Sequence, residues 1–276
     1  MTVEFLPLGI ALSLFIYAGL ASFRAHPEPK REAADSTPPP VPPPALPPVL
    51  FTLVDGFPLR EIAKGQEDGY AVIYLQPIDE RWLLGLSQAP AGLRQQCHAT
   101  AHFPSGEIAL GWACGQQVAG LSHGGGQWAL LLSQGGPQGL QRWHTTAAFP
   151  QEEIASAWND GFQVSSLAYG DGVWALILSQ GDGHSVQQWF KTAEFPREEI
   201  EAGWGNGYEV SSLAYGEGAW ALVMSQTDQP AAQYFHIEAT FPDEEIAKGV
   251  ANGYRPSSLV YAAGTWALLM SKSAAQ

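Results

Sequence analysis

Residues 195–226 have the sequence FPREEIEAGWGNGYEVSSLAYGEGAWALVMSQ, and the chain returns to this pattern every 46 residues. A second clear copy, residues 149–180, is FPQEEIASAWNDGFQVSSLAYGDGVWALILSQ. The five copies begin at Phe57, Phe103, Phe149, Phe195 and Phe241, and each of these residues is followed by proline. A fixed period of this length is the signature of a repeat architecture. The repeat therefore determines the fold class before any local pattern is considered.

Each copy predicts a short helix followed by β-strands. The proline and glutamates at its start suit the first turn of a helix, and a glycine shared by all copies suits the helix end. Around Glu217-Gly218, two apolar segments predict strands joined by a tight hairpin. A further strand, such as residues 232–240, precedes the next Phe-Pro pair. Each unit is therefore expected to be helix, strand, strand, strand, with the strands forming a meander.

The two ends of the repeat array complement each other. The fifth copy ends at Ser271-Lys272 without its last strand, whereas an equivalent segment, residues 50–56, precedes the first Phe-Pro pair. Pairing of this segment with the last hairpin would close the array and remove its exposed edges. We therefore expect a mainly β domain with short helices over residues 50–276, a five-bladed β-propeller-like toroid. An open solenoid with the same phase is the alternative.

The N-terminal segment 1–23 predicts a single transmembrane helix. Residues 5–23 are 19 consecutive uncharged residues, about the length that crosses a bilayer. A cleaved signal peptide is the alternative, although no Lys or Arg precedes the apolar run. Arg24, Lys30 and Arg31 follow it, so the positive-inside bias favours a single-pass membrane protein with a cytoplasmic domain. An extracytoplasmic orientation stays open, because acidic residues accompany these basic ones.

Residues 24–49 predict a Pro-rich linker. Between Pro38 and Pro48, PPPVPPPALPP favours extended polyproline II, which would hold the domain away from the membrane. Such a run also suits an aromatic groove of a partner, although a spacer is the commoner role.

Composition excludes several classes of function. The formal charge is −14, from 27 acidic and 13 basic residues, which is the opposite of a nucleic-acid-binding footprint. The two cysteines, Cys97 and Cys114, lie at unrelated positions of neighbouring copies, so we expect free thiols and neither a disulfide framework nor a metal site. No cofactor motif is present, and no nucleic-acid partner is expected.

The pattern FPxEEIxxxWxxG(Y/F)xVSSLAYGxGxWALxxS resembles the repeat domain that follows the kinase domain in plant casein-kinase-1-like proteins, a domain of unknown function. The resemblance covers residues 50–276. This chain has neither a Gly-rich phosphate loop nor a His-Arg-Asp catalytic motif, so the resemblance implies a non-catalytic module. The first two copies depart from the pattern, with Gln66 where Trp158 stands later and Gln116 in place of Tyr208.

The hairpin tips carry the candidate ligand-binding residues. A tyrosine and an acidic residue lie together at two tips and suit a sugar, because the carboxylate accepts hydrogen bonds from hydroxyls while the ring packs on the sugar face. These residues are Tyr169, Asp171, Tyr215 and Glu217. The tip changes to Gly124-Gly125 in the second copy and to Ala262-Ala263 in the last, and turn chemistry alone explains the glycines.

Three other repeated sets have a structural explanation beside a functional one. The five tryptophans are expected in the core between blades, although they also suit sugar stacking. The five glutamates suit the helix dipole, although a ring of carboxylates would bind cations or a basic partner. Three histidines would meet only if their strand lined the central channel. The sets are Trp82, Trp128, Trp174, Trp220 and Trp266; Glu61, Glu107, Glu153, Glu199 and Glu245; and His98, His144 and His236.

No Ser-His-Asp set, P-loop or zinc-ligand pattern is found, so we do not expect an enzyme. The sequence favours a membrane-anchored, non-catalytic protein-interaction or scaffold module, such as an accessory subunit of a larger membrane complex. Its partners would be a membrane-associated protein and, through residues 5–23, the bilayer. The alternative is a lectin-like carbohydrate-binding protein on the extracytoplasmic side.

Overall fold

The computed structural model describes residues 49–135, 139–180, 186–227 and 230–272. The expected membrane anchor, and the linker up to Pro48, lie outside these ranges. Within them, no helix is long and apolar enough to cross a membrane.

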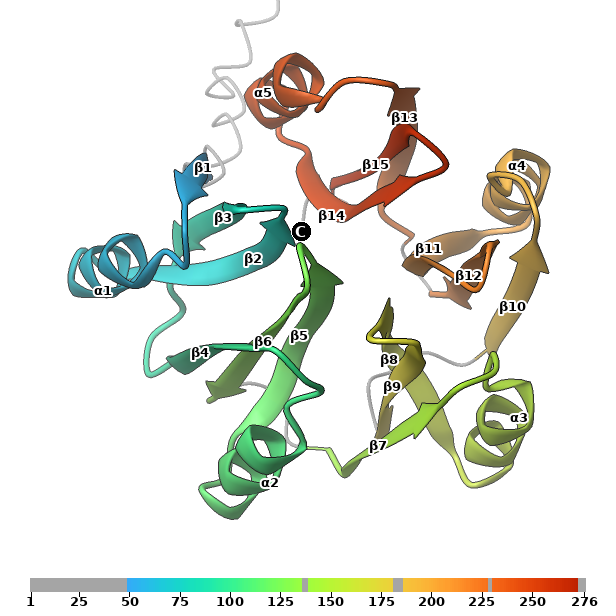
Figure 1. Ribbon diagram of the computed structural model, residues 1–276, viewed down its shortest axis with the longest axis horizontal. Coiled ribbons are helices and arrows are strands. Elements are labelled where there is room, and N and C mark those ends of the chain that lie inside the picture. The colour runs from blue at the N-terminus through green and yellow to red at the C-terminus, as the bar shows by residue number, and fades with distance from the viewer. Residues whose placement is uncertain (1–48, 136–138, 181–185, 228–229, 273–276) are drawn as a thin grey trace, which may run out of the picture. The chain divides into compact units, whose positions relative to one another are not determined.

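The described chain is mainly β, with five three-stranded antiparallel sheets and one nine-residue helix for each sheet (Figure 1). The first repeat comprises β1 (Leu50–Asp55), α1 (Leu59–Glu67), β2 (Tyr70–Ile78) and β3 (Arg81–Gln88). The second comprises β4 (Arg94–Thr100), α2 (Ser105–Ala113), β5 (Gln117–Gly124) and β6 (Gln127–Gln134). The third comprises β7 (Gln141–Thr146), α3 (Gln151–Asn159), β8 (Phe162–Gly170) and β9 (Val173–Gln180). The fourth comprises β10 (Val186–Thr192), α4 (Arg197–Gly205), β11 (Tyr208–Gly216) and β12 (Ala219–Gln226). The fifth comprises β13 (Ala232–Glu238), α5 (Asp243–Ala251), β14 (Arg255–Ala262) and β15 (Thr265–Lys272).

The order of strands within each sheet differs from the expected meander. In the first sheet the order is β1-β3-β2, so the last strand in the chain lies in the middle. Helix α1 connects β1 to β2 across the sheet, and β3 then lies between these two strands. A meander is the expectation when consecutive strands pair, but a helical connection leaves the first strand free to pair with the far edge of the hairpin.

The phase of the repeat also differs from the expectation. Strand β1 pairs with β3 along its whole length, from Leu50 opposite Leu86 to Asp55 opposite Arg81. The prediction that residues 50–56 pair with the last hairpin is therefore wrong. The fifth sheet already has its third strand, β13, which pairs with β15. Every sheet is thus built from consecutive elements of the chain, and all five copies have three strands.

Local conformation follows the sequence signals closely. Pro196 is the N-cap of α4 rather than its first helical residue, and Gly207 beyond the helix end has a φ of 78°. The hairpin of the fourth sheet turns at Glu217 and Gly218, both with positive φ, as a type I′ turn requires. A register shift between Val210 and Ser212 marks a bulge in the inner strand. This bulge recurs in every sheet.

The core lies within and between the sheets. The middle strands are the most buried elements; in β12 the side chains of residues 220–225 are all buried. The repeated tryptophans lie in this core as expected, with Trp266 half-buried and the others buried. Hydrophobic clusters span neighbouring sheets, and one of them joins Ile78 and Leu83 of the first sheet to Leu259 of the fifth.

Candidate functional site

The edge strands β2, β5, β8, β11 and β14 line one cavity of about 670 Å³. In Figure 1 these strands face the middle of the domain, while the helices lie on the outside. The volume falls within the range of small-molecule sites. Serines and tyrosines contribute much of its lining, and the candidate residues Tyr169 and Tyr215 lie on its wall.

Serine hydroxyls of the inner strands donate hydrogen bonds to the backbone of the preceding sheet. Ser166 donates to the carbonyl oxygen of Leu121 at 3.3 Å, and the equivalent Ser212 and Ser258 bind Leu167 and Leu213. The second copy has glycine at this position, and Ser122 two residues later binds Leu75 instead. These four serines of the cavity wall are therefore committed to joining the sheets.

One glutamine, buried at Gln187 and half-buried in the other copies, joins the two sheets in each of four neighbouring pairs. Gln187 of β10 accepts hydrogen bonds from the backbone N–H of Val164 (2.8 Å) and the indole of Trp158 (3.0 Å). Its amide nitrogen donates to the Val164 carbonyl and to the hydroxyl of Ser225, both at 3.0 Å. Gln95, Gln141 and Gln233 make the equivalent backbone pair with Val72, Val118 and Val210. We call this arrangement the glutamine bracket.

Between the fifth and first sheets the bracket is replaced. Val49, which has no side-chain amide, stands in the position of the glutamine, and Pro256, which has no N–H to donate, stands in the position of the valine. A tyrosine, Tyr74, stands where three later copies have the serine, and its hydroxyl hydrogen-bonds with the backbone of Leu259. Burial raises the pKa of Tyr74 well above its usual value. Arg81 also lies over the ring of Phe241, 6.0 Å from its centroid.

The acidic candidates Asp171 and Glu217 bind tryptophans of the preceding sheet. The indole N–H of Trp128 donates to Asp171 at 3.0 Å, and that of Trp174 donates to Glu217 at 2.9 Å. His102 and His123 flank the Asp171 carboxylate, each at 3.8 Å. We call the two tryptophan contacts acid–indole bonds, and they assign both carboxylates a role in holding the sheets together.

The tyrosine candidates also pack between sheets. Tyr169 lies against Trp174 with ring centroids 5.0 Å apart, and it covers Gly216 of the fourth sheet so closely that an added Cβ there would approach the ring to 2.3 Å. Tyr215 packs on Trp220 in the same way. The structure therefore brings Tyr169 and Tyr215 to one cavity wall and places each acidic candidate at the tip of the same hairpin.

The acid–indole bond predicts a dependence of stability on pH. The hydrogen bond from Trp174, with support from Lys191, lowers the pKa of Glu217 below its usual 4.5. A carboxyl with a depressed native-state pKa stabilises the fold above its unfolded-state pKa, and this contribution is lost as the pH falls through the native value. The urea concentration at the unfolding midpoint is expected to decrease as the pH falls below about 4.5, and Glu217→Gln should make this decrease smaller. Glu80→Gln, at an exposed turn, is the matched control and should leave the slope unchanged.

The remaining candidates lie apart. His98, His144 and His236 are on the outer strands β4, β7 and β13, away from the cavity lining. In the described part of the chain, no group of three or more His, Cys, Asp or Glu side chains could hold a metal ion. Cys97 and Cys114 are free, as expected, and burial raises the pKa of Cys97 to about 12.

A family model described as "Domain of unknown function (DUF7477)" matches residues 49–173 and again residues 128–276. The two matches together cover all five sheets. The chain belongs to this family. The two matches to the DUF7477 model overlap at residues 128–173, as expected when several copies have one pattern. Among curated proteins, none matches the chain.

The glutamine bracket was missed in the sequence, although its signal was available within this DUF7477 chain. Gln95, Gln141, Gln187 and Gln233 lie 46 residues apart, so the repeat includes them. Their significance depends on a valine 23 residues earlier in the chain, which no local pattern links to them.

Proposed function

We propose that this protein is a non-catalytic protein-interaction or scaffold module, anchored in the membrane by residues 5–23 with the repeat domain in the cytoplasm. One observation carries the proposal: the recurring glutamines of four copies and the acidic residues of two hairpin tips are committed to joining the sheets. Gln187 uses four hydrogen bonds for this purpose, and Glu217 accepts a hydrogen bond from the indole of Trp174. The solvent-exposed side chains of the helices and outer strands are then available to a partner.

The outer surface supports this proposal because it differs from copy to copy. Leu110 of α2 is 70% exposed, whereas the equivalent residues of α3 and α5 are Ser156 and Lys248. Trp143 of β7 is exposed, whereas its equivalent Trp189 is half-buried. The outer faces of the scaffold thus differ between copies, as a module that assembles several protein contacts requires.

Affinity capture of the full chain from gently solubilised membranes tests this function. A stoichiometric protein partner is expected, and its recovery should fall when Leu110→Ser is combined with Trp143→Ser. The control pair Leu59→Ser and Tyr261→Ser removes comparable exposed apolar surface elsewhere and should leave recovery unchanged. Absence of any stoichiometric partner would contradict the proposal. Protease treatment of sealed vesicles of known orientation checks that the domain faces the cytoplasm.

We also propose that the five sheets close into a propeller-like ring. The first and fifth sheets have a common hydrophobic cluster, and Tyr74 reaches the backbone of Leu259 as the serines do between other sheets. The inner strands of all five sheets line one cavity. These contacts favour closure over the open solenoid.

A double substitution tests closure. Val49→Gln with Pro256→Val should create a fifth glutamine bracket, because Ser87 already stands where Ser225 binds Gln187. In a closed ring the pair should raise the free energy of unfolding by about 1–3 kcal/mol beyond the sum of the single substitutions. Additive effects of the two substitutions would show that these sheets are not in register and would contradict closure.

A lectin-like function on the extracytoplasmic side is the second candidate. Two observations favour it: the carboxylates of Asp171 and Glu217 remain about one-third exposed, and the rings of Tyr169 and Tyr215 line the cavity. Glycan-array binding that is lost in Tyr169→Ala and Tyr215→Ala would support this function over the scaffold. If the protein binds no glycan on the array, the lectin-like function is excluded.

A further inference from the structure

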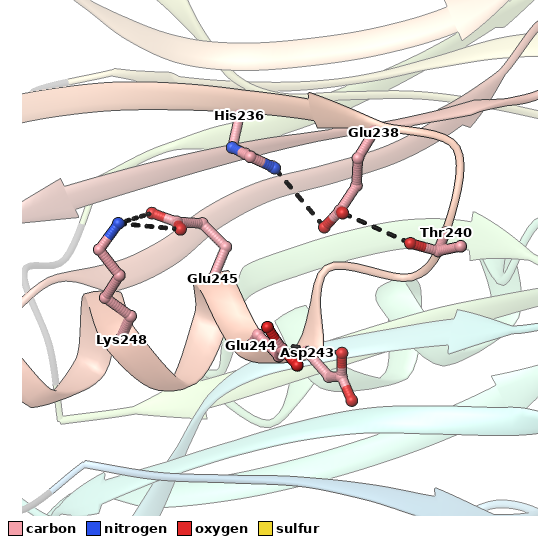
Figure 2. Close-up of polar contacts among 7 residues, drawn as sticks. All are labelled: His236, Glu238, Thr240, Asp243, Glu244, Glu245 and Lys248. Carbon is pink, nitrogen blue, oxygen red and sulfur yellow. Dashed lines mark hydrogen bonds and ion pairs between the residues drawn. The ribbon is translucent and has the colours of Figure 1, made fainter.

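In the fifth repeat, the space between strand β13 and helix α5 is occupied by Tyr234. Its hydroxyl donates a hydrogen bond to Glu245, and its ring packs on Tyr254 at a centroid distance of 5.0 Å. Lys248 holds the same carboxylate at 3.2 Å. Figure 2 shows Lys248 reaching Glu245 along the helix, with His236 and Glu238 on the adjacent strand.

Burial and hydrogen bonding shift the pKa values of both Tyr234 and Glu245. Burial, and then the adjacent carboxylate of Glu245, raise the pKa of Tyr234 to about 12. Burial works against the charge on Glu245, but hydrogen bonds from Lys248 and Tyr234 lower the pKa of Glu245 overall. The fifth repeat therefore contains a pocket in which a carboxylate accepts a hydrogen bond from a phenol.

In the third repeat the equivalent space is only partly filled. The residue equivalent to Tyr234 is Arg142, which pairs with Leu178 of β9 as Tyr234 pairs with Met270 of β15. Arg142 points to the C-terminal end of the helix: its guanidinium bonds Asp160, the C-cap of α3, at 3.0 Å and lies 4.1 Å from the centroid of Phe162, the equivalent of Tyr254. These two contacts leave a groove of about 370 Å³ between β7 and α3.

The groove keeps the acceptor that Tyr234 uses in the fifth repeat. Glu153, the equivalent of Glu245, lies in its wall with His144 beside it at 3.3 Å, and Leu178 is also among the lining residues. Ser156 replaces the long side chain of Lys248, so the opening is not covered from the helix.

One difference between the third and fifth repeats limits how deeply a phenol ring can enter the space between strand and helix. Gly249 of the fifth repeat is replaced by Ala157, and a Cβ at position 249 would lie 2.6 Å from the Tyr234 hydroxyl. A phenol in the third repeat must therefore sit slightly farther out. An occupant that enters from solvent, rather than from the strand itself, meets this condition.

We propose that this groove, lined by Arg142, His144, Glu153, Ser156 and Leu178, binds a tyrosine side chain of a partner protein, whose hydroxyl donates to Glu153. The proposal rests on the scaffold function and names the chemistry of one contact. The carboxylates of Glu152 and Glu153 both line the groove, and the guanidinium of Arg142 is already paired with Asp160, so a phosphorylated tyrosine is repelled by like charge. Phosphorylation of the partner would then release this contact.

Titration of the full chain with N-acetyl-tyrosinamide, followed by NMR, tests the groove without any knowledge of the partner. Saturable binding is expected, with N-acetyl-phenylalaninamide at least about tenfold weaker because it leaves the Glu153 acceptor without a donor. The O-phosphorylated tyrosinamide should not bind. Equal binding of the tyrosine and phenylalanine amides would overturn the proposal.

Two variants locate the site. Arg142→Tyr reproduces the fifth repeat and should fill the groove and abolish tyrosinamide binding, while Gln96→Tyr, the same change at the equivalent exposed position of the second sheet, should leave it intact. Ser156→Trp, on the exposed face of α3, blocks the groove from the helix and serves if Arg142→Tyr does not fold. Retention of binding in a folded Arg142→Tyr or Ser156→Trp protein contradicts the assignment. If the protein captures a partner but does not bind tyrosinamide, the groove proposal is refuted and the scaffold function stands. If it binds tyrosinamide but captures no partner, the scaffold function is refuted.

Discussion

Replacing Gln187 with leucine is expected to lower the free energy of unfolding by about 3–5 kcal/mol, the largest effect of any polar substitution in the domain. The side chain is 8% exposed and makes four hydrogen bonds. Leucine fills similar volume but leaves the backbone groups of Val164, the indole of Trp158 and the Ser225 hydroxyl without partners. Each buried group without a partner costs about 1–3 kcal/mol, and such costs are not fully additive.

The first bracket provides the control. Gln95 is only half-buried and binds the backbone of Val72, but Gln66 stands in place of the tryptophan that donates in the later copies. Gln95→Leu is therefore expected to cost about half as much, roughly 1–3 kcal/mol. Urea denaturation followed by tryptophan fluorescence measures both. Equal shifts for the two variants would show that the bracket's extra hydrogen bonds contribute little.

Gly216→Ala is expected to destabilise the protein by about 1–3 kcal/mol, because the new methyl group would overlap the Tyr169 ring. The added Cβ would lie 2.3 Å from a ring carbon and 2.7 Å from the Tyr169 Cβ, so a rotation of the ring alone does not relieve the contact. The ring also packs against Trp174, with ring centroids 5.0 Å apart. The third and fourth sheets must therefore separate slightly.

Gly205→Ala is the matched control, since no atom lies within 4 Å of its added Cβ and the residue ends helix α4. Alanine there should stabilise the protein by up to about 1 kcal/mol, through its higher helix propensity. Thermal denaturation of both variants distinguishes the contact from a general effect of the methyl group. A neutral Gly216→Ala would mean that Tyr169 does not hold the adjacent sheet.

Much of the fold was predictable because it depends on local signals. Proline, acidic residues and glycine mark each helix, and Glu217-Gly218 marks a hairpin whose two positive φ values the structure shows. The pairing of residues 50–56 was not predictable, since the same apolar pattern pairs equally well with the last hairpin or with β3. A short loop keeps two consecutive strands close enough to pair, whereas a helix between them allows the first strand to pair elsewhere.

The sequence identified the hairpin-tip residues but not their partners, because those partners lie far away in the chain. Asp171 and Glu217 have the chemistry of a sugar site, but the indoles from which they accept hydrogen bonds lie 43 residues earlier, on another sheet. Exact repetition also hides the third-repeat groove, which depends on Arg142 bonding Asp160 whereas Tyr234 bonds Glu245. Differences between copies acquire meaning only when the side chains are placed.

Because β1 pairs with β3 of its own repeat, every sheet is complete within one uninterrupted segment of the chain. The first sheet has all its strands once residue 88 has left the ribosome, and each later sheet then forms against a finished neighbour. Folding can thus proceed in the order of synthesis, with contacts of short sequence separation and without a strand that waits for the C-terminus. The same boundaries allow a gene to gain or lose a 46-residue unit without leaving any sheet with a missing strand.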